Sequence, residues 1–190
     1  MWSGLRGRLD IASKHEDLYL FKFILGNWIT VVDILSDQDI NILVKEKKLL
    51  PKDYHLKIKV HPKKGHKERE LDIKGENGHD FRLILRQSIL NPLDFSVILA
   101  FRPVNSNVIF RLRRYNGKSH EHTNMIEHST FYDYHIHQAT ERYQQLGLRE
   151  DAYAEPTDRF ADFNEAISCL IEDCRFELPS GTQKSLFEGN

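Results

Sequence analysis

Hydrophobic residues alternate with polar or basic ones in several short stretches that follow Gly78. Residues 81–86, 95–101 and 108–113 each repeat with a period of two, which predicts three strands. The breaks between them are short and contain Asn and Pro, so hairpins and an antiparallel meander are expected. A further strand is predicted at 131–137, where residues two apart share a face.

Helical spacing of apolar residues appears on both sides of this meander. Ser36 is a residue type that caps helices, and the apolar spacing after it predicts a helix that Pro51 ends. Residues 138–146 predict a short helix. A final helix is expected to begin near Thr157 and to carry an apolar stripe as far as Cys174, which would cover one face of the sheet.

These patterns predict a single α+β domain over residues 36–178. Its sheet is expected to be an antiparallel meander of about five strands, packed by two to four helices. Residues 1–35 include the most apolar run of the chain, but a lysine, an asparagine and an aspartate interrupt it. We therefore expect this segment to join the core rather than to span a membrane. Residues 179–190 predict a flexible tail.

Charge and cysteine content narrow the classes of function. Lysines and arginines (27) nearly balance aspartates and glutamates (28), so no global field attracts nucleic acid or a membrane. The basic stretch 57–74 begins in a predicted strand at 55–60, contains several acids and is expected to be an exposed connection. Cys169 and Cys174 have no metal or redox spacing and predict reduced thiols in a cytoplasmic protein. No P-loop, dinucleotide-binding fingerprint or Gly-x-Ser-x-Gly elbow is present.

Half of the histidines gather in one short part of the chain. Five of the ten lie between positions 120 and 137. Histidine can exchange a proton near neutral pH, and its neutral form is the commonest metal ligand. Two pairs have the form His-x-His, which places both rings on one face of an extended segment. If the strand before Gly117 pairs with the strand that starts at Phe131, the two pairs converge. The five are His120, His122, His128, His135 and His137.

The interpretation that we favour from these residues is metal-independent cleavage of RNA, with no cofactor. His120 and His122 would act as general acid and base, and His135 and His137 would assist them. Substrate contacts are expected from Arg111, Arg113, Tyr115 and Lys118.

Two alternatives stay open. In the first, His120, His122, His128, His135 and His137 hold zinc or another transition metal, in a metal-binding protein or a metallohydrolase. In the second, the imidazoles only bond to backbone and water, and the protein is a non-enzymatic accessory or antitoxin-type interaction protein.

Three segments of the chain resemble a family of small uncharacterised bacterial proteins. They are Phe81–Leu83, Phe95–Leu99 and, above all, Arg113–Asn124 with its Asn-Gly-x-x-His-x-His motif. The resemblance extends over roughly residues 70–178. It groups the chain with these proteins and implies no activity.

The motif is also similar to TumE-like toxins of bacterial toxin–antitoxin pairs, in which a basic and aromatic strand leads through a glycine-containing turn into His-x-His. This similarity implies a ribonuclease-like toxin that acts on RNA beside an antitoxin-type protein partner. The chain departs from those shorter toxins by its long N-terminal part and by the segment 128–157. The matching positions are Arg113, Tyr115, Gly117, His120 and His122.

Overall fold

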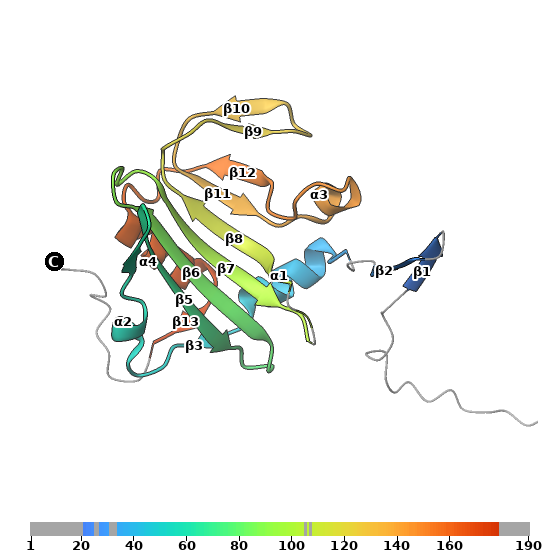
Figure 1. Cartoon of the computed structure of the whole chain (residues 1–190), viewed down its shortest axis with the longest axis horizontal. Coiled ribbons are helices and arrows are strands. Elements are labelled where there is room, and N and C mark those ends of the chain that lie inside the picture. The colour runs from blue at the N-terminus through green and yellow to red at the C-terminus, as the bar shows by residue number, and fades with distance from the viewer. Residues whose placement is uncertain (1–20, 25–26, 31–33, 105, 107, 179–190) are drawn as a thin grey trace, which may run out of the picture. The chain divides into compact units, whose positions relative to one another are not determined.

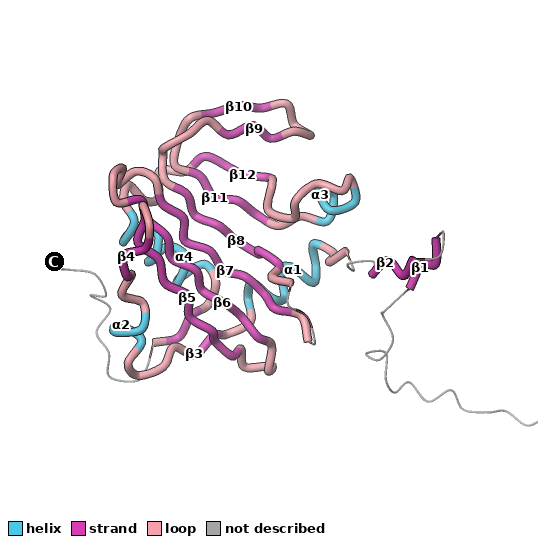
Figure 2. Tube along the Cα trace, in the orientation of Figure 1, coloured by secondary structure: helices cyan, strands magenta, loops and turns pink. Residues whose placement is uncertain are grey.

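The structure is a computed structural model. It describes residues 21–24, 27–30, 34–104, 106 and 108–178. Figures 1 and 2 show the chain as a cartoon and as a tube.

Contacts divide the chain into two units, residues 1–34 and 35–190. In the first unit, two short strands pair as an antiparallel hairpin. The predictions of a core role for residues 1–35 and of a flexible tail at 179–190 fall largely or wholly outside the described residues, and they stay predictions. The two strands are β1 (Phe21–Ile24) and β2 (Asn27–Thr30).

A seven-stranded antiparallel sheet dominates the second unit, in the order β12-β11-β8-β7-β6-β5-β4 (Figure 1). The five strands from β4 to β8 form a meander, and a separate hairpin, β9–β10, leaves the sheet between β8 and β11. The strands of the sheet are β4 (His61–Lys63), β5 (His66–Lys74), β6 (Asp80–Ser88), β7 (Phe95–Arg102), β8 (Phe110–Asn116), β11 (His135–Gln138) and β12 (Tyr153–Pro156). The hairpin consists of β9 (His122–Asn124) and β10 (Ser129–Phe131), and β3 (Lys48–Leu49) pairs in parallel with β13 (Phe176–Glu177).

The apolar face of the sheet packs against helices. The inward residues of β6 and β7, among them Leu83 and Leu99, are almost fully buried with the apolar stripe of α4. A capping box between Ser36 and Asp39 starts α1, as the sequence predicts. The last helix begins later than expected, because Asp162 rather than Thr157 caps it. The helices are α1 (Asp37–Lys45), α2 (Tyr54–Lys57), α3 (Glu141–Gln145) and α4 (Phe163–Asp173).

The predicted α+β class is confirmed, but the sheet has seven strands rather than about five. The difference has two sources. The basic stretch is not a loop but contains β4 and β5, and residues 153–156, which were not predicted as a strand, form β12. On one face of β5, Glu70 and Asp72 form ion pairs with Arg82 of β6. Because charged residues dominate the segment, the alternation of apolar and polar residues that identifies a strand is not apparent in its sequence. The predicted strand at 55–60 is wrong, because its first part belongs to α2.

In the described part of the chain, no helix combines the length and the apolar composition needed to cross a bilayer.

Candidate metal centre

The pairing of β8 with β11 sets the geometry of the site. His135 lies opposite Asn116, and His137 lies opposite Arg114. Directly opposite residues point to the same face of a sheet. The intervening Tyr115 points into the core, so these four residues occupy the face away from α4. The strand before Gly117 therefore pairs with the segment that carries His135 and His137, as the sequence predicts, but this strand begins at His135, and Phe131 belongs to β10.

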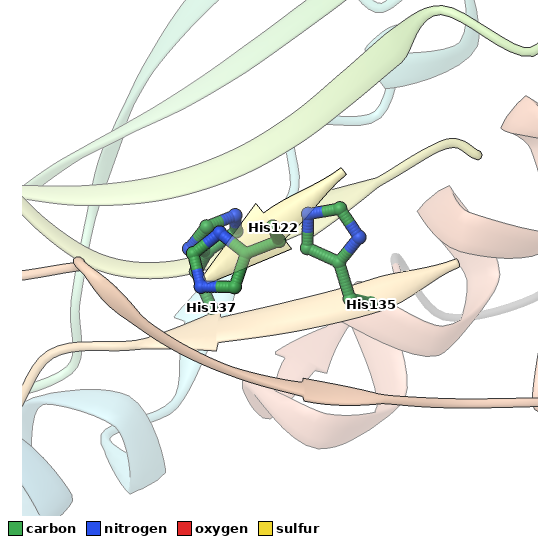
Figure 3. Close-up of side chains that lie close together, drawn as sticks. All are labelled: His122, His135 and His137. Carbon is green, nitrogen blue, oxygen red and sulfur yellow. The ribbon is translucent and has the colours of Figure 1, made fainter. Parts of the chain in front are cut away.

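The β9–β10 hairpin supplies the third histidine. Asn124 ties the hairpin to β12, because its side-chain amide donates to the Ala154 carbonyl at 2.8 Å and its Oδ1 accepts from the Ala154 N–H at 2.9 Å. His122, two residues earlier in β9, has its Nε2 3.0 Å from the same Oδ1. Figure 3 shows the ring of His122 beside those of His135 and His137.

The three rings meet at one point. One nitrogen from each of His122, His135 and His137 lies within 4.8 Å of the others. The ring centroid of His122 lies 4.7 Å from that of His137 and 5.3 Å from that of His135. Tetrahedral zinc with Zn–N bonds of about 2.0 to 2.1 Å holds its nitrogens about 3.3 Å apart. To bind such an ion, the nitrogens would have to approach one another by up to about 1.5 Å.

Backbone carbonyls hold the far nitrogens of the two buried rings. His135 Nδ1 lies 2.7 Å from the Asp133 carbonyl oxygen, and His137 Nδ1 lies 2.9 Å from that of Asp151. A proton on each Nδ1 satisfies these contacts and leaves the lone pair of each Nε2 available to a hydrogen-bond donor or a metal ion, an arrangement typical of histidine ligands. The Asn116 amide is 3.4 and 3.3 Å from the two Nε2 atoms and can donate to them.

Burial keeps the triad neutral. Desolvation lowers the pKa of His135 from 6.5 to about 4. It lowers the pKa of His137 still further, with the nearby Arg114 charge acting in the same direction. Partial burial also lowers the pKa of His122. The rings are therefore in the form that binds metals at neutral pH, and they are poor proton donors there.

A buried ion pair between Arg114 and Asp151 lies beside His137. Arg114 Nε lies 2.9 Å from an oxygen of the fully buried Asp151 carboxylate, and Arg149 contacts the other oxygen at 2.6 Å. Because the Asp151 carbonyl also accepts from His137, this pair holds the loop before β12 against the ring. Arg114 and Asn116 were not among the site residues predicted from the sequence. Their spacing of two in a strand was the available signal, but only the register reveals their face.

Two of the predicted histidines lie outside the triad. His120 is exposed, with its ring centroid 5.6 Å from that of His135, and its Nδ1 is 3.2 Å from the Ser119 hydroxyl. His128 is exposed in the β9–β10 turn at a φ of 53°. Within the described residues, the group of converging nitrogens includes neither of them.

The four predicted substrate contacts do not gather around the triad. Arg113 and Tyr115 line a separate cavity of about 280 Å³ on the other face of the sheet. Tyr115 donates to the Asp173 carboxylate there at 2.7 Å. Arg111 pairs with Glu150, and exposed Lys118 pairs with Asp133 at 2.8 Å.

No protein-family model, curated protein or solved structure matches this chain. The resemblances to small bacterial proteins and to TumE-like toxins stay predictions.

Proposed function

We propose that the protein binds a divalent transition metal, in the first place zinc, through His122, His135 and His137, and uses it in hydrolysis. The observation that carries the proposal is the approach of three neutral ring nitrogens to within 4.8 Å of one another. Three histidine ligands are typical of catalytic zinc sites, which leave a fourth position for water. Bound zinc would lower the pKa of that water to about 7 and so supply a nucleophile.

The pKa values favour this proposal over acid–base chemistry by the triad. A metal-free mechanism with two histidines needs one of them protonated at working pH. The pKa of His135 is about 4, and that of His137 is lowered further, so neither holds a proton at pH 7. Burial does not disfavour the neutral form of the ring, which is the form that binds a metal.

A metal-free ribonuclease is the second candidate. It is favoured by one observation, the exposed ring of His120 at the rim of the triad, 5.6 Å from that of His135. In this mechanism His120 would donate the proton and neutral His122 would accept one. RNA as substrate and an antitoxin-type partner rest on the sequence resemblance.

Metal titration tests the first proposal. Chelator-treated full-length protein is titrated with Zn²⁺ by calorimetry and with Co²⁺ by visible absorption. We expect one ion per chain and tetrahedral cobalt bands. His122→Ala and His135→Ala should each weaken binding at least about 100-fold, since each removes a direct ligand, whereas the exposed His128→Ala should not. Equal loss in the His128 variant, or no stoichiometric binding, contradicts the proposal.

Cleavage assays separate the two candidates. RNA and bis(p-nitrophenyl) phosphate are incubated with the protein, with zinc or with chelator. Activity that chelation abolishes and zinc restores supports the metal mechanism. Activity that survives chelation but is lost in His120→Ala supports the metal-free one, and growth arrest relieved by the same variant would add the toxin role.

A further inference from the structure

One row of paired residues crosses the sheet and ends at the candidate metal centre. Arg86 of β6 lies opposite Ser96 of β7, Ser96 opposite Asn116 of β8, and Asn116 opposite His135 of β11. All four therefore point to the same face. Three steps between strands of about 4.8 Å place Arg86 about 14 Å from His135.

A cavity of about 500 Å³ lies at the far end of this row. Its lining comes from the β4–β5 turn, the end of β6 and the start of β7. Lys64, His66 and Arg86 line it together with Ser96 and Asp94.

One hydrogen-bonded link joins the cavity to the centre, and a second joins the cavity to His120 at the rim of the triad. In the first, the Ser96 hydroxyl donates to Asn116 Oδ1 at 2.8 Å, and the Asn116 amide reaches the histidine Nε2 atoms. In the second, the Ser119 hydroxyl lies 3.4 Å from the Asp94 carboxylate and 3.2 Å from His120 Nδ1. The Asn116 side chain therefore contacts both Ser96 of the cavity lining and the histidine nitrogens of the centre.

The loop 117–120 packs closely against the start of β7, which lines the cavity. The Gly117 N–H donates to the Phe95 carbonyl at 3.1 Å. A Cβ at Gly117 would lie 1.9 Å from the Leu93 carbonyl oxygen, so only glycine allows this approach.

The lining of the cavity has a net positive charge, because Lys64 and Arg86 are set against the single carboxylate of Asp94. Glu68 lies opposite Arg86 in the pairing of β5 with β6. Among the described residues, neither Lys64 nor Arg86 forms an ion pair, whereas the neighbouring Arg82 has two acidic partners. His66 and Lys63 together bind the nearby Glu68 carboxylate. Asp94 is the carboxylate of the lining and partly opposes the two cations. Arginine and lysine without acidic partners are the groups that bind phosphate oxygens.

We infer that this cavity binds a phosphate group of the substrate on which the metal centre acts. The inference deepens the proposed function and rests on it for the reaction, although the anion site itself requires no metal. The substrate class is an extended phosphate ester, such as a nucleotide-containing chain. One phosphate lies against Lys64 and Arg86, and the reacting bond lies about three strands away at the histidines.

The test uses chelator-treated, full-length protein in low-salt, sulfate-free buffer. Inorganic phosphate, adenosine 5′-monophosphate and adenosine are titrated and followed by calorimetry. We expect both phosphates to bind and adenosine not to bind. Lys64→Gln and Arg86→Gln should each weaken phosphate binding about tenfold, since each removes a charged hydrogen-bond donor. Lys67→Gln is the matched control, because Lys67 is exposed on the other face of β5 and outside the lining.

The outcomes separate this inference from the proposed function. An equal loss in the Lys67 variant, or no loss in either cavity variant, overturns the anion site. If adenosine 5′-monophosphate binds more weakly than inorganic phosphate, the cavity does not hold a phosphorylated substrate, and the inference is overturned. Phosphate binding without zinc binding refutes the metal function alone, and zinc binding without phosphate binding refutes the anion site alone. Where both hold, Arg86→Gln should raise KM about tenfold for a phosphorylated substrate with kcat little changed.

Discussion

Lowering the pH from 7 to 5 is expected to destabilise the metal-free protein through the two buried histidines of β11. His135 is fully buried, and its pKa falls from 6.5 to about 4 on folding. Between these two values the unfolded chain binds a proton at this ring and the folded chain does not. Stability therefore rises with pH across this window and is lost as the pH falls.

The size of the effect follows from the two pKa values. At pH 5 the His135 ring favours unfolding by about 2 kcal/mol, and at pH 7 by only about 0.2 kcal/mol. The pKa of His137 is lowered further from the same causes, so it acts in the same direction. The expected loss between pH 7 and pH 5 is about 2 to 4 kcal/mol, a large fraction of the stability of a typical domain.

Carboxylates contribute little to the change in the free energy of unfolding between pH 7 and pH 5. Ion pairs and hydrogen bonds lower the pKa of Glu68, Asp72 and Asp173 below their ordinary values. Their stabilising contribution is lost progressively as the pH falls below about 5, toward and past the ordinary carboxyl pKa values. The window between pH 7 and pH 5 therefore isolates the histidines.

Urea denaturation of chelator-treated protein at pH 7, 6 and 5 measures the free energy of unfolding. His135→Gln should reduce the pH-dependent loss by about 2 kcal/mol, because glutamine has no titrating group in either the folded or the unfolded chain. His128→Gln, at an exposed turn, should leave the loss unchanged. A stability that stays constant within about 0.5 kcal/mol between pH 7 and 5, or a loss that His135→Gln does not reduce, would refute the reasoning.

Three substitutions test contacts that support the site or the core. Gly117→Ala places a methyl group 1.9 Å from the Leu93 carbonyl oxygen and should cost at least about 2 kcal/mol; an unchanged Tm contradicts this. Asn124→Ala removes two hydrogen bonds to Ala154 and should weaken zinc binding about tenfold in calorimetry; full affinity would show that they do not position His122. Lys48→Met leaves carbonyls at the end of α1 without their buried donor and should lower stability to urea by about 2 kcal/mol; equal stability argues against this role.

The sequence alone determined the local elements of this protein. Period-two alternation predicted β6, β7 and β8, and Ser36 predicted the start of α1, because these signals lie within a few residues of the element that they specify. It also drew attention to the histidine-rich segment, of whose five histidines three converge in the structure. It failed at β5, where ion pairs across the sheet replace the apolar pattern.

Only the tertiary structure decided which side chains meet. The register between β8 and β11 places Arg114 and Asn116 beside the histidines and Arg113 on the opposite face. A shift of one residue would reverse that choice. The convergence of His122 with the two rings of β11 depends on the fold of a hairpin against β12, a contact between distant parts of the chain that no local pattern encodes.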